Sequence, residues 1–256
     1  MRVLMIGDVV GQAGCAHLSR VLPMLRRTYV PDVVIANGEN AAEGNGLLPA
    51  SARQLRESGV DIITSGNHIL RRKEIYDILE DEDYIVRPAN LHSSAPGRGL
   101  VIYEGLKFRL CVINLLGTAF MDPLDNPFDT IDRLMEQTDG CKMVIVDFHA
   151  EATAEKLCMG FYLDGRASLV VGTHTHVQTA DERLLPGGTG SITELGMCGC
   201  FNSVLGVKPA GAIRRMRTHL PTRFENDPGE QCLSGIIADL DEKTGKTTHI
   251  ERINIF

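Results

Sequence analysis

Short apolar runs alternate with segments of helical periodicity over the first two thirds of the chain. The apolar runs lie at 2–6, 32–36, 60–64, 143–147 and 169–172. The segments in which apolar residues recur every three to four positions lie at 13–29, 49–58, 71–80, 128–138 and 151–163. Each run is short enough for a buried strand and is followed by Gly or polar residues, so the pattern predicts repeated strand–turn–helix units.

Two further regions have the character of β-hairpins. The runs at 100–103 and 108–115 flank a turn at 104–107, and those at 234–240 and 247–255 flank a turn at 243–246. Antiparallel hairpins beside strand–helix units indicate mixed strand pairing. The chain shows no internal repeat and no low-complexity linker. We therefore predict a single α/β domain over residues 1–256, with mixed β-sheets sandwiched by helices.

Polar side chains of metal-binding type follow five of the predicted strands. They are Asp8, then Glu39 and Asn40, then Asn67 and His68, then His149, and finally His174 and His176. Any one of them fits an ordinary helix cap or a solvated histidine. Because the carboxyl ends of parallel strands meet at one edge, we expect the five positions to lie together along one edge of a doubly wound sheet.

These side chains make up a coherent ligand set. It contains two carboxylates, two amide oxygens and imidazoles but no thiolate, and it is larger than one metal ion requires. Two metal ions that share a bridging carboxylate would use it fully, and such pairs serve phosphoester cleavage. Mixed oxygen and nitrogen ligands suit iron, manganese or zinc better than calcium.

The chain resembles the calcineurin-like metallophosphoesterases, and more closely their YmdB-like branch of bacterial cyclic-nucleotide phosphodiesterases. The motifs that carry the resemblance are Gly7-Asp8-Val9-Val10-Gly11, Asn37-Gly38-Glu39-Asn40, Gly66-Asn67-His68, Asp147-Phe148-His149-Ala150-Glu151-Ala152 and Gly172-Thr173-His174-Thr175-His176. They occur in the family's order, and together they are specific. The resemblance implies the calcineurin-like metallophosphoesterase fold.

Three positions depart from the wider superfamily and match the YmdB-like branch. Val10 stands where the superfamily has a histidine ligand, Glu39 replaces a bridging Asp, and Ile69 replaces an acid after the Asn-His pair. Asn40 directly follows Glu39 and could fill the vacancy that Val10 leaves.

The resemblance also implies an assignment of ligands and roles. One metal takes Asp8, Glu39, Asn40 and His176, and the other takes Glu39, Asn67, His149 and His174. A hydroxide held between the metals would attack phosphorus, and His68, which is not a ligand, would protonate the departing ribose oxygen as general acid. The expected cofactors are two divalent or trivalent ions, with iron first and manganese or zinc as alternatives. The expected substrates are 2′,3′-cyclic mononucleotides, with 3′,5′-cyclic ones as a further candidate.

Composition and net charge limit the kinds of molecule that the chain is expected to bind. The chain has a net charge of −7 and is 43% hydrophobic, which argues against stable nucleic-acid binding and leaves a small anionic substrate. No apolar run approaches the length of a membrane span. Seven scattered cysteines favour reduced thiols and a cytoplasmic location, and a homo-oligomer would be unsurprising.

Several alternatives stay open. A broad-specificity phosphatase or a nuclease could use the same metals, and a non-catalytic regulatory protein could keep the fold. Glu151 could support a ligand or cap a helix, and Thr173 and Thr175 could contact phosphate or serve structure. Other residues are interpreted as structural or exposed, and they are His17, His92, His219, His249 and the loop arginines Arg214, Arg215 and Arg217. The stretch 206–229 could be a loop over the site or an oligomer contact.

Overall fold

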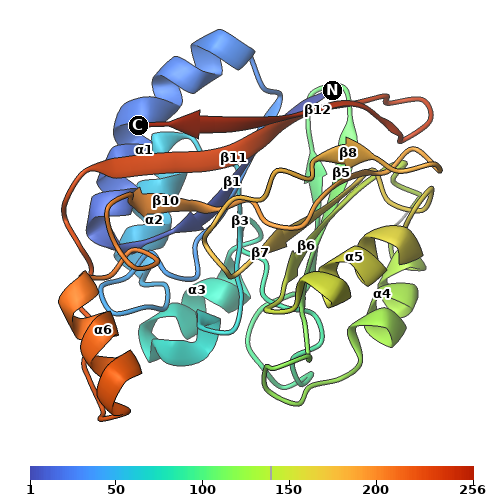
Figure 1. Ribbon diagram of the computed structural model, residues 1–256. Coiled ribbons are helices and arrows are strands. Elements are labelled where there is room, and N and C mark those ends of the chain that lie inside the picture. The colour runs from blue at the N-terminus through green and yellow to red at the C-terminus, as the bar shows by residue number, and fades with distance from the viewer. Residues whose placement is uncertain (139) are drawn as a thin grey trace.

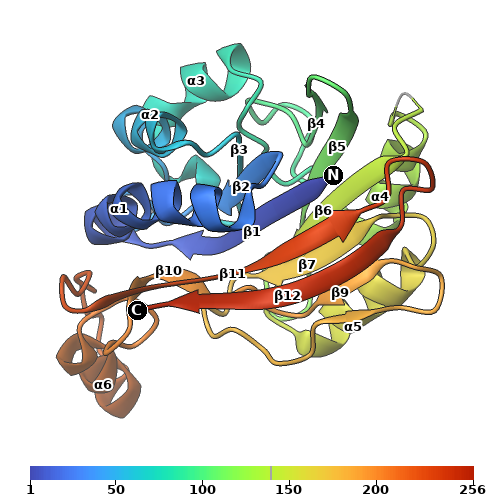
Figure 2. The same ribbon diagram turned by 90° about the horizontal axis from the view of Figure 1, so that it is seen from above.

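The computed structural model describes residues 1–138 and 140–256 and contains two mixed β-sheets packed face to face, with helices on both outer faces (Figures 1 and 2). This arrangement confirms the predicted α/β class with mixed sheets sandwiched by helices. Among the described residues, no helix is both long and apolar enough to cross a membrane.

The first sheet has the strand order β12-β11-β10-β1-β2-β3. Its strands are β1 (Arg2–Val9), β2 (Val33–Asn37), β3 (Ile62–Thr64), β10 (Met197–Cys200), β11 (Gln231–Leu240) and β12 (Thr247–Ile255). Strands β1, β2, β3 and β10 are parallel where they pair, whereas β11 runs antiparallel to β1, β10 and β12. The C-terminal hairpin is therefore joined to the N-terminal strand.

The second sheet has the order β4-β5-β6-β7-β9-β8. Its strands are β4 (Leu100–Glu104), β5 (Arg109–Leu116), β6 (Met143–His149), β7 (Leu169–Thr173), β8 (Arg183–Leu184) and β9 (Gly190–Ile192). The predicted hairpin is the antiparallel pair β4–β5, and β5, β6, β7 and β9 are parallel neighbours. The prediction of one doubly wound sheet edge was wrong, because the strands that carry the site divide between two sheets.

Helices cover the outer faces. They are α1 (Gly11–Tyr29), α2 (Pro49–Ser58), α3 (Tyr76–Asp81), α4 (Pro127–Met135) and α5 (Thr153–Tyr162), whereas α6 (Pro209–Thr218) lies at the edge of the molecule. The predicted helix at 71–80 is instead two 3₁₀ turns, η1 (Ile69–Arg71) and η2 (Lys73–Ile75), followed by the short α3. Arg214, Arg215 and Arg217 lie on α6, not on a loop as predicted.

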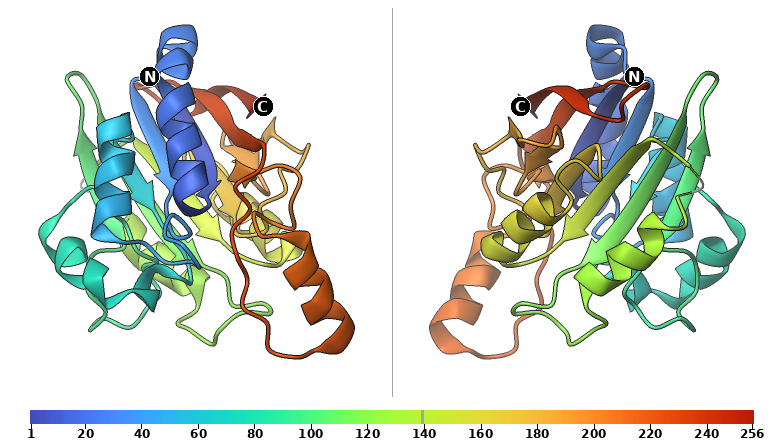
Figure 3. Two further views of the ribbon diagram at one scale, coloured as in Figure 1. Left: turned by 90° about the vertical axis from the view of Figure 1, so that its left-hand side faces the viewer. Right: turned by 90° about the vertical axis from the view of Figure 1, so that its right-hand side faces the viewer.

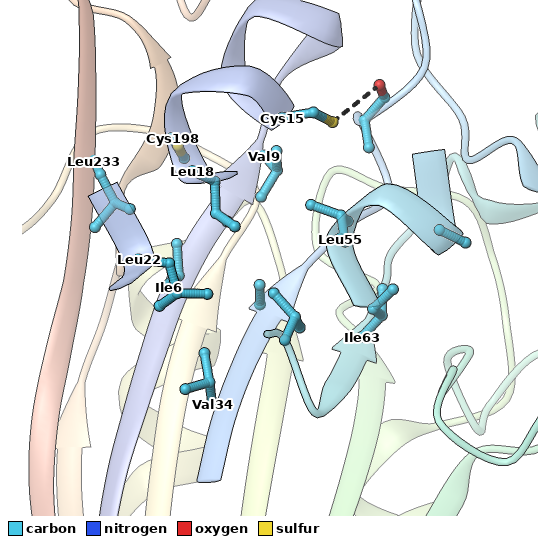
Figure 4. Packing of buried hydrophobic residues seen from close by; sticks show 14 of the residues in the cluster. Ile6, Val9, Cys15, Leu18, Leu22, Val34, Leu55, Ile63, Cys198 and Leu233 are labelled. Atoms are coloured by element: carbon cyan, nitrogen blue, oxygen red, sulfur yellow. Dashed lines mark hydrogen bonds between the residues drawn. The ribbon is translucent and has the colours of Figure 1, made fainter. Parts of the chain in front are cut away.

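Period-two alternation along the strands divides the core into three layers. Val3 and Met5 of β1 point between the two sheets, whereas Leu4 and Ile6 point toward the helices. Figure 4 shows Ile6 in the helix-facing layer, packed near Leu22 of α1. Since successive side chains alternate between the faces of a strand, continuous apolar runs are what two covered faces require. Rigid packing on both sides then fixes the strand ends.

One region differs from this packed body. Residues 201–229, which include α6, project at the edge of the molecule (Figures 1 and 3). Ile213 and Met216 of α6 are 52% and 76% exposed. Backbone hydrogen bonds from Val204 to Val207 and from Lys208 to Glu225 hold the segment together. We call residues 201–229 the arm.

Candidate metal centre

Five strand ends from both sheets bring the predicted ligands together. Asp8 lies on β1, Glu39 and Asn40 follow β2, Asn67 and His68 follow β3, His149 ends β6, and His174 and His176 follow β7. Asp8, Glu39 and His149 are completely buried. Buried charged groups are rare in proteins unless they are paired or hold a metal.

The first cluster of donor atoms surrounds Nε2 of His149. That atom lies 3.3 Å from Oε1 of Glu39, 3.1 Å from Oδ1 of Asn67 and 3.1 Å from Nδ1 of His174. Donor atoms of Glu39, His149 and His174 all lie within 4.8 Å of one another. Two imidazoles with two oxygen donors form a ligand set that suits zinc, iron or manganese.

The second cluster contacts the same Glu39 oxygen, Oε1. Nε2 of His176 is 3.6 Å from Oδ1 of Asp8. Nδ2 of Asn40 lies 3.0 Å from Oε1 of Glu39 and 3.3 Å from Nε2 of His176. Glu39 therefore contacts both groups of donors, as a bridging carboxylate must. Ligation by Asn40 requires its amide to turn by 180°, which exchanges Oδ1 and Nδ2.

Hydrogen bonds on the far side of each histidine hold the ring in place. Nδ1 of His149 lies 2.9 Å from Oγ1 of Thr173, and that hydroxyl donates to Oδ1 of Asp147 at 2.7 Å. Nδ1 of His176 lies 3.0 Å from the carbonyl oxygen of Leu205. In both rings Nδ1 is thereby engaged as donor, which leaves Nε2 available to a metal.

Glu151 supports His174 in the same way. Its Oε2 lies 3.1 Å from Nε2 of His174, on the opposite side of the ring from His149. Helix α5 begins only at Thr153 and has no side-chain cap. Of the two predicted roles, the structure therefore shows the contact with a ligand and not the helix cap.

A buried ion pair fixes the loop that carries His174 and His176. Nζ of Lys156 lies 2.8 Å from Oε2 of Glu194, and both side chains are nearly inaccessible. The same oxygen accepts hydrogen bonds from the backbone N–H and the hydroxyl of Thr175. Thr175 thus serves structure. Sequence reasoning missed Lys156 and Glu194, because nothing in their spacing indicates that they meet.

The backbone of this loop is strained. His174 and His176 have φ angles of 105° and 65°, in a region that L-residues rarely adopt. Such strain persists only where the surrounding structure enforces it, and it gathers at functional sites. The Lys156–Glu194 pair and the Leu205 carbonyl supply that restraint.

The charges of the site favour a cation. Burial disfavours the charged form of His149, but Glu39 and Asp8 outweigh burial and raise its pKa to about 9. Burial and the neighbouring His149 lower the pKa of His174 to about 4. Burial of Glu39 opposes its ionisation, yet the attraction of His149 lowers its pKa. The carboxylates of Glu39 and Asp8 thus stabilise a positive charge at His149, and a metal ion bound there would be stabilised in the same way.

A cavity of about 610 Å³ opens over the donors, within the range of small-molecule sites. Its wall includes His68 on one side and Phe224 and Asn226 of the arm on the other. Arg214, Arg215 and Arg217 do not line it. Cys198 and Cys200 are buried, and burial raises the pKa of the Cys198 thiol, as expected for core thiols.

The comparison with known proteins gives the family. The profile of the YmdB-like proteins matches residues 4–253. The chain belongs to the YmdB-like family.

Relatives at several distances share the fold. The chain is 48% identical to the 2′,3′-cyclic-nucleotide 2′-phosphodiesterase of Bacillus subtilis (strain 168), over 100% of this chain and 97% of that protein. A hypothetical protein of Thermus thermophilus has a crystal structure that superposes with a TM-score of 0.94 at 42% identity, covering 99% of this chain and 98% of that one. The calcineurin-like phosphoesterase YfkN of Bacillus subtilis superposes with a TM-score of 0.58 at 12% identity, covering 100% and 90%, so the YmdB-like chain shares the calcineurin-like fold.

Proposed function

We propose that this YmdB-like chain is a dinuclear-metal phosphodiesterase that hydrolyses cyclic mononucleotides, 2′,3′-cyclic ones first and 3′,5′-cyclic ones second. The observation that carries the proposal is that Oε1 of Glu39 contacts both groups of donor atoms, and that Glu39 lines a cavity. The relative named for 2′,3′-cyclic-nucleotide 2′-phosphodiesterase activity supports the choice of substrate.

The residues present would hold two ions. Asp8, Glu39, Asn40 and His176 would hold one, and Glu39, Asn67, His149 and His174 would hold the other. Iron is our first choice, with manganese or zinc as alternatives. When bound, a pair of such ions stabilises the charge of an in-line phosphoryl displacement and lowers the pKa of water.

His68 is placed to handle a proton. Its Nδ1 lies 3.1 Å from Oε1 of Glu39, and its backbone N–H donates to Oε2 of Glu39. These contacts hold the ring at the cavity wall, where the side chain is 20% exposed. Protonated His68 would then give a proton to the departing oxygen as general acid.

Hydrolysis of a 2′,3′-cyclic substrate would open the ring at O2′. Water adds to phosphorus, the bond from phosphorus to O2′ breaks, and O2′ takes the proton from His68. The product is a nucleoside 3′-phosphate. The proton that water releases restores the imidazolium of His68 through solvent.

The test compares substrates and a His68→Ala variant. We expect the wild type to hydrolyse adenosine 2′,3′-cyclic phosphate with a higher kcat/KM than 4-nitrophenyl phosphate or RNA. His68→Ala should lower kcat by about 10²–10⁴-fold while the metal content per chain stays the same. Faster hydrolysis of the monoester or of RNA would favour the phosphatase or nuclease alternative. Full metal content without turnover on any ester would favour a regulatory protein.

Further proposals concern the domain organisation, nucleic-acid binding, cellular location and oligomeric state of the chain. We infer one domain over 1–256, because β11 of the C-terminal hairpin pairs with β1. The net charge of −7 disfavours a stable complex with nucleic acid. The seven cysteines are scattered along the sequence, which supports a cytoplasmic location. Light scattering would measure whether the chain forms a homo-oligomer.

A further inference from the structure

The arm completes the wall of the cavity with side chains that no metal requires. Phe224 and Asn226 line the cavity over the donor atoms, and they also line an adjoining hollow of about 410 Å³ together with Glu43 and Arg223. Among the described residues that line the main cavity, Phe224 is the only phenylalanine, tyrosine or tryptophan. The residue is 45% exposed.

Asn226 presents an unused polar group at the same wall. Its Nδ2 is buried and has no hydrogen-bond partner among the described residues. A buried amide without a partner costs free energy, and a bound ligand with an acceptor atom would remove that cost. The amide lies over Gly11, where a Cβ atom would come within 2.0 Å of Nδ2. Gly11 also has a φ of +63°, so glycine makes room for Asn226.

The backbone holds both side chains on one side of the arm. Asn226 pairs with Val207 in an antiparallel bridge, and hydrogen bonds join Lys208 to Glu225 and Asp227 to Gly206. In an extended segment residues two apart face the same way, so Phe224 and Asn226 both face the cavity. Leu205 of the same arm holds the ring of His176, which ties this wall to the donor atoms.

We infer that Phe224 and Asn226 form the subsite for the nucleoside part of the substrate. The base would stack on the ring of Phe224, and the amide of Asn226 would turn from Gly11 toward the cavity and donate from Nδ2 to an acceptor of the nucleoside. This inference rests on the proposed function for the position of the phosphate. It adds that the arm would select nucleotides over other phosphodiesters, since the strand-end donors would contact only the phosphate and the reacting oxygens.

The experiment compares two substrates that differ only in the base. They are adenosine 2′,3′-cyclic phosphate and methyl riboside 2,3-cyclic phosphate, measured with Phe224→Ala and Asn226→Ala. We expect each variant to lower the preference for the adenosine compound, as the ratio of the two kcat/KM values, by about 5-fold or more. The change should come from KM. Phe224→Tyr, which keeps an aromatic face, should restore the ratio.

Met216→Ala provides the matched control. Met216 lies on the same arm, is 76% exposed and does not line the cavity, so this variant should keep the wild-type ratio. Equal losses on both substrates in Phe224→Ala would show a structural role of the arm and overturn the inference, as would an unchanged ratio.

A binding measurement separates this inference from the proposed function. Calorimetry with adenosine 3′-phosphate and inorganic phosphate needs no turnover. We expect Phe224→Ala to weaken binding of adenosine 3′-phosphate by about 5-fold or more relative to its effect on phosphate. The wild type could hydrolyse neither cyclic ester while Phe224→Ala still weakens binding of adenosine 3′-phosphate more than binding of phosphate. That result would support the nucleoside subsite and contradict the proposed reaction. If both ligands are affected equally, the subsite falls even when the enzyme is active.

Discussion

The strand-end donors and the arm build the same cavity in opposite ways. Asp8, Glu39 and His149 are completely buried on or beside central strands, with hydrogen bonds behind them. Phe224 and Met216 of the arm are exposed, and the arm is held mainly by its own backbone bonds. We infer from this difference that the packed strand ends hold the reacting groups in place, and that the exposed arm binds the nucleoside part of the substrate. Substitutions in the first region should therefore have large effects, and matched ones in the arm or on the outer surface small ones.

The largest effect should come from Glu39→Ala. Glu39 contacts both groups of donors, so its removal should empty both metal positions. We expect kcat/KM to fall by more than about 100-fold, the upper end of the loss when only an outer partner of a ligand is removed. Elemental analysis measures the metal directly. The exposed Glu57 on α2 supplies the control Glu57→Ala, which should keep both ions. Two ions per chain in Glu39→Ala would remove Glu39 as the bridge.

A methyl group added at Gly66 should also disrupt the strand-end donors. A Cβ atom at Gly66 would lie 2.4 Å from both Oε2 of Glu39 and Nε2 of His149, and neither buried group has room to move. Gly66→Ala should therefore lower metal affinity by about 10-fold or more, measured by titration with a competing chelator. On α6, a Cβ at Gly211 meets nothing closer than 3.8 Å, and Gly211→Ala should leave the affinity unchanged. Equal affinities in the two variants would show that the site adapts more freely than its packing suggests.

An ion pair in each region offers a comparison of stability. Lys156 and Glu194 are buried and 2.8 Å apart, so Lys156→Ala leaves a buried carboxylate without its cation. We expect a loss of about 3–5 kcal/mol in the free energy of unfolding, measured by denaturant titration. Lys208 and Glu225 of the arm are also 2.8 Å apart but half or more exposed, and Lys208→Ala should not change stability measurably. A similar small effect in both variants would contradict a restraining role for Lys156.

The smallest effect should come from an ion pair between β1 and β11, Arg2 with Asp239, and it should depend on pH. The hydrogen bond from Arg2 lowers the pKa of Asp239. A carboxyl with a lower pKa in the folded chain stabilises the fold above its ordinary pKa of about 4, and this contribution is lost as the pH falls through the folded value. Asp239→Asn should cost below about 1 kcal/mol at neutral pH because the pair is partly exposed. The difference from wild type should shrink from about pH 5 toward pH 3, and a difference that does not change with pH would show that the charge contributes nothing.

The sequence predicted the strands and most helices because their packing is periodic. The runs at 143–147 and 169–172 became β6 and β7, and the polar residues after them reached one site. The division into two sheets was not predicted, since strands buried on both faces look alike in either arrangement. The helix expected at 71–80 failed because the η1 and η2 turns interrupt it.

The residues expected to bind metal could be predicted from the sequence, but the hydrogen-bond partners that orient them could not. His149 and His176 stand in recognisable motifs, but the partners of their Nδ1 atoms, Thr173 and the carbonyl of Leu205, depend on tertiary contacts. Leu205 lies 29 residues from His176 and contributes a backbone atom, which no side-chain pattern reveals. The role of 206–229 stayed open for the same reason, because Phe224 and Asn226 reach the site through tertiary contacts such as the pairing of Asn226 with Val207.

The most direct test of this account is the metal content of the wild-type chain, measured by elemental analysis after purification without chelator. Because Glu39 contacts two groups of oxygen and nitrogen donors, we expect about two equivalents of iron, manganese or zinc per chain. Absence of metal after reconstitution with each of these ions would contradict the account, because the buried carboxylates and histidines would then have no cation to hold.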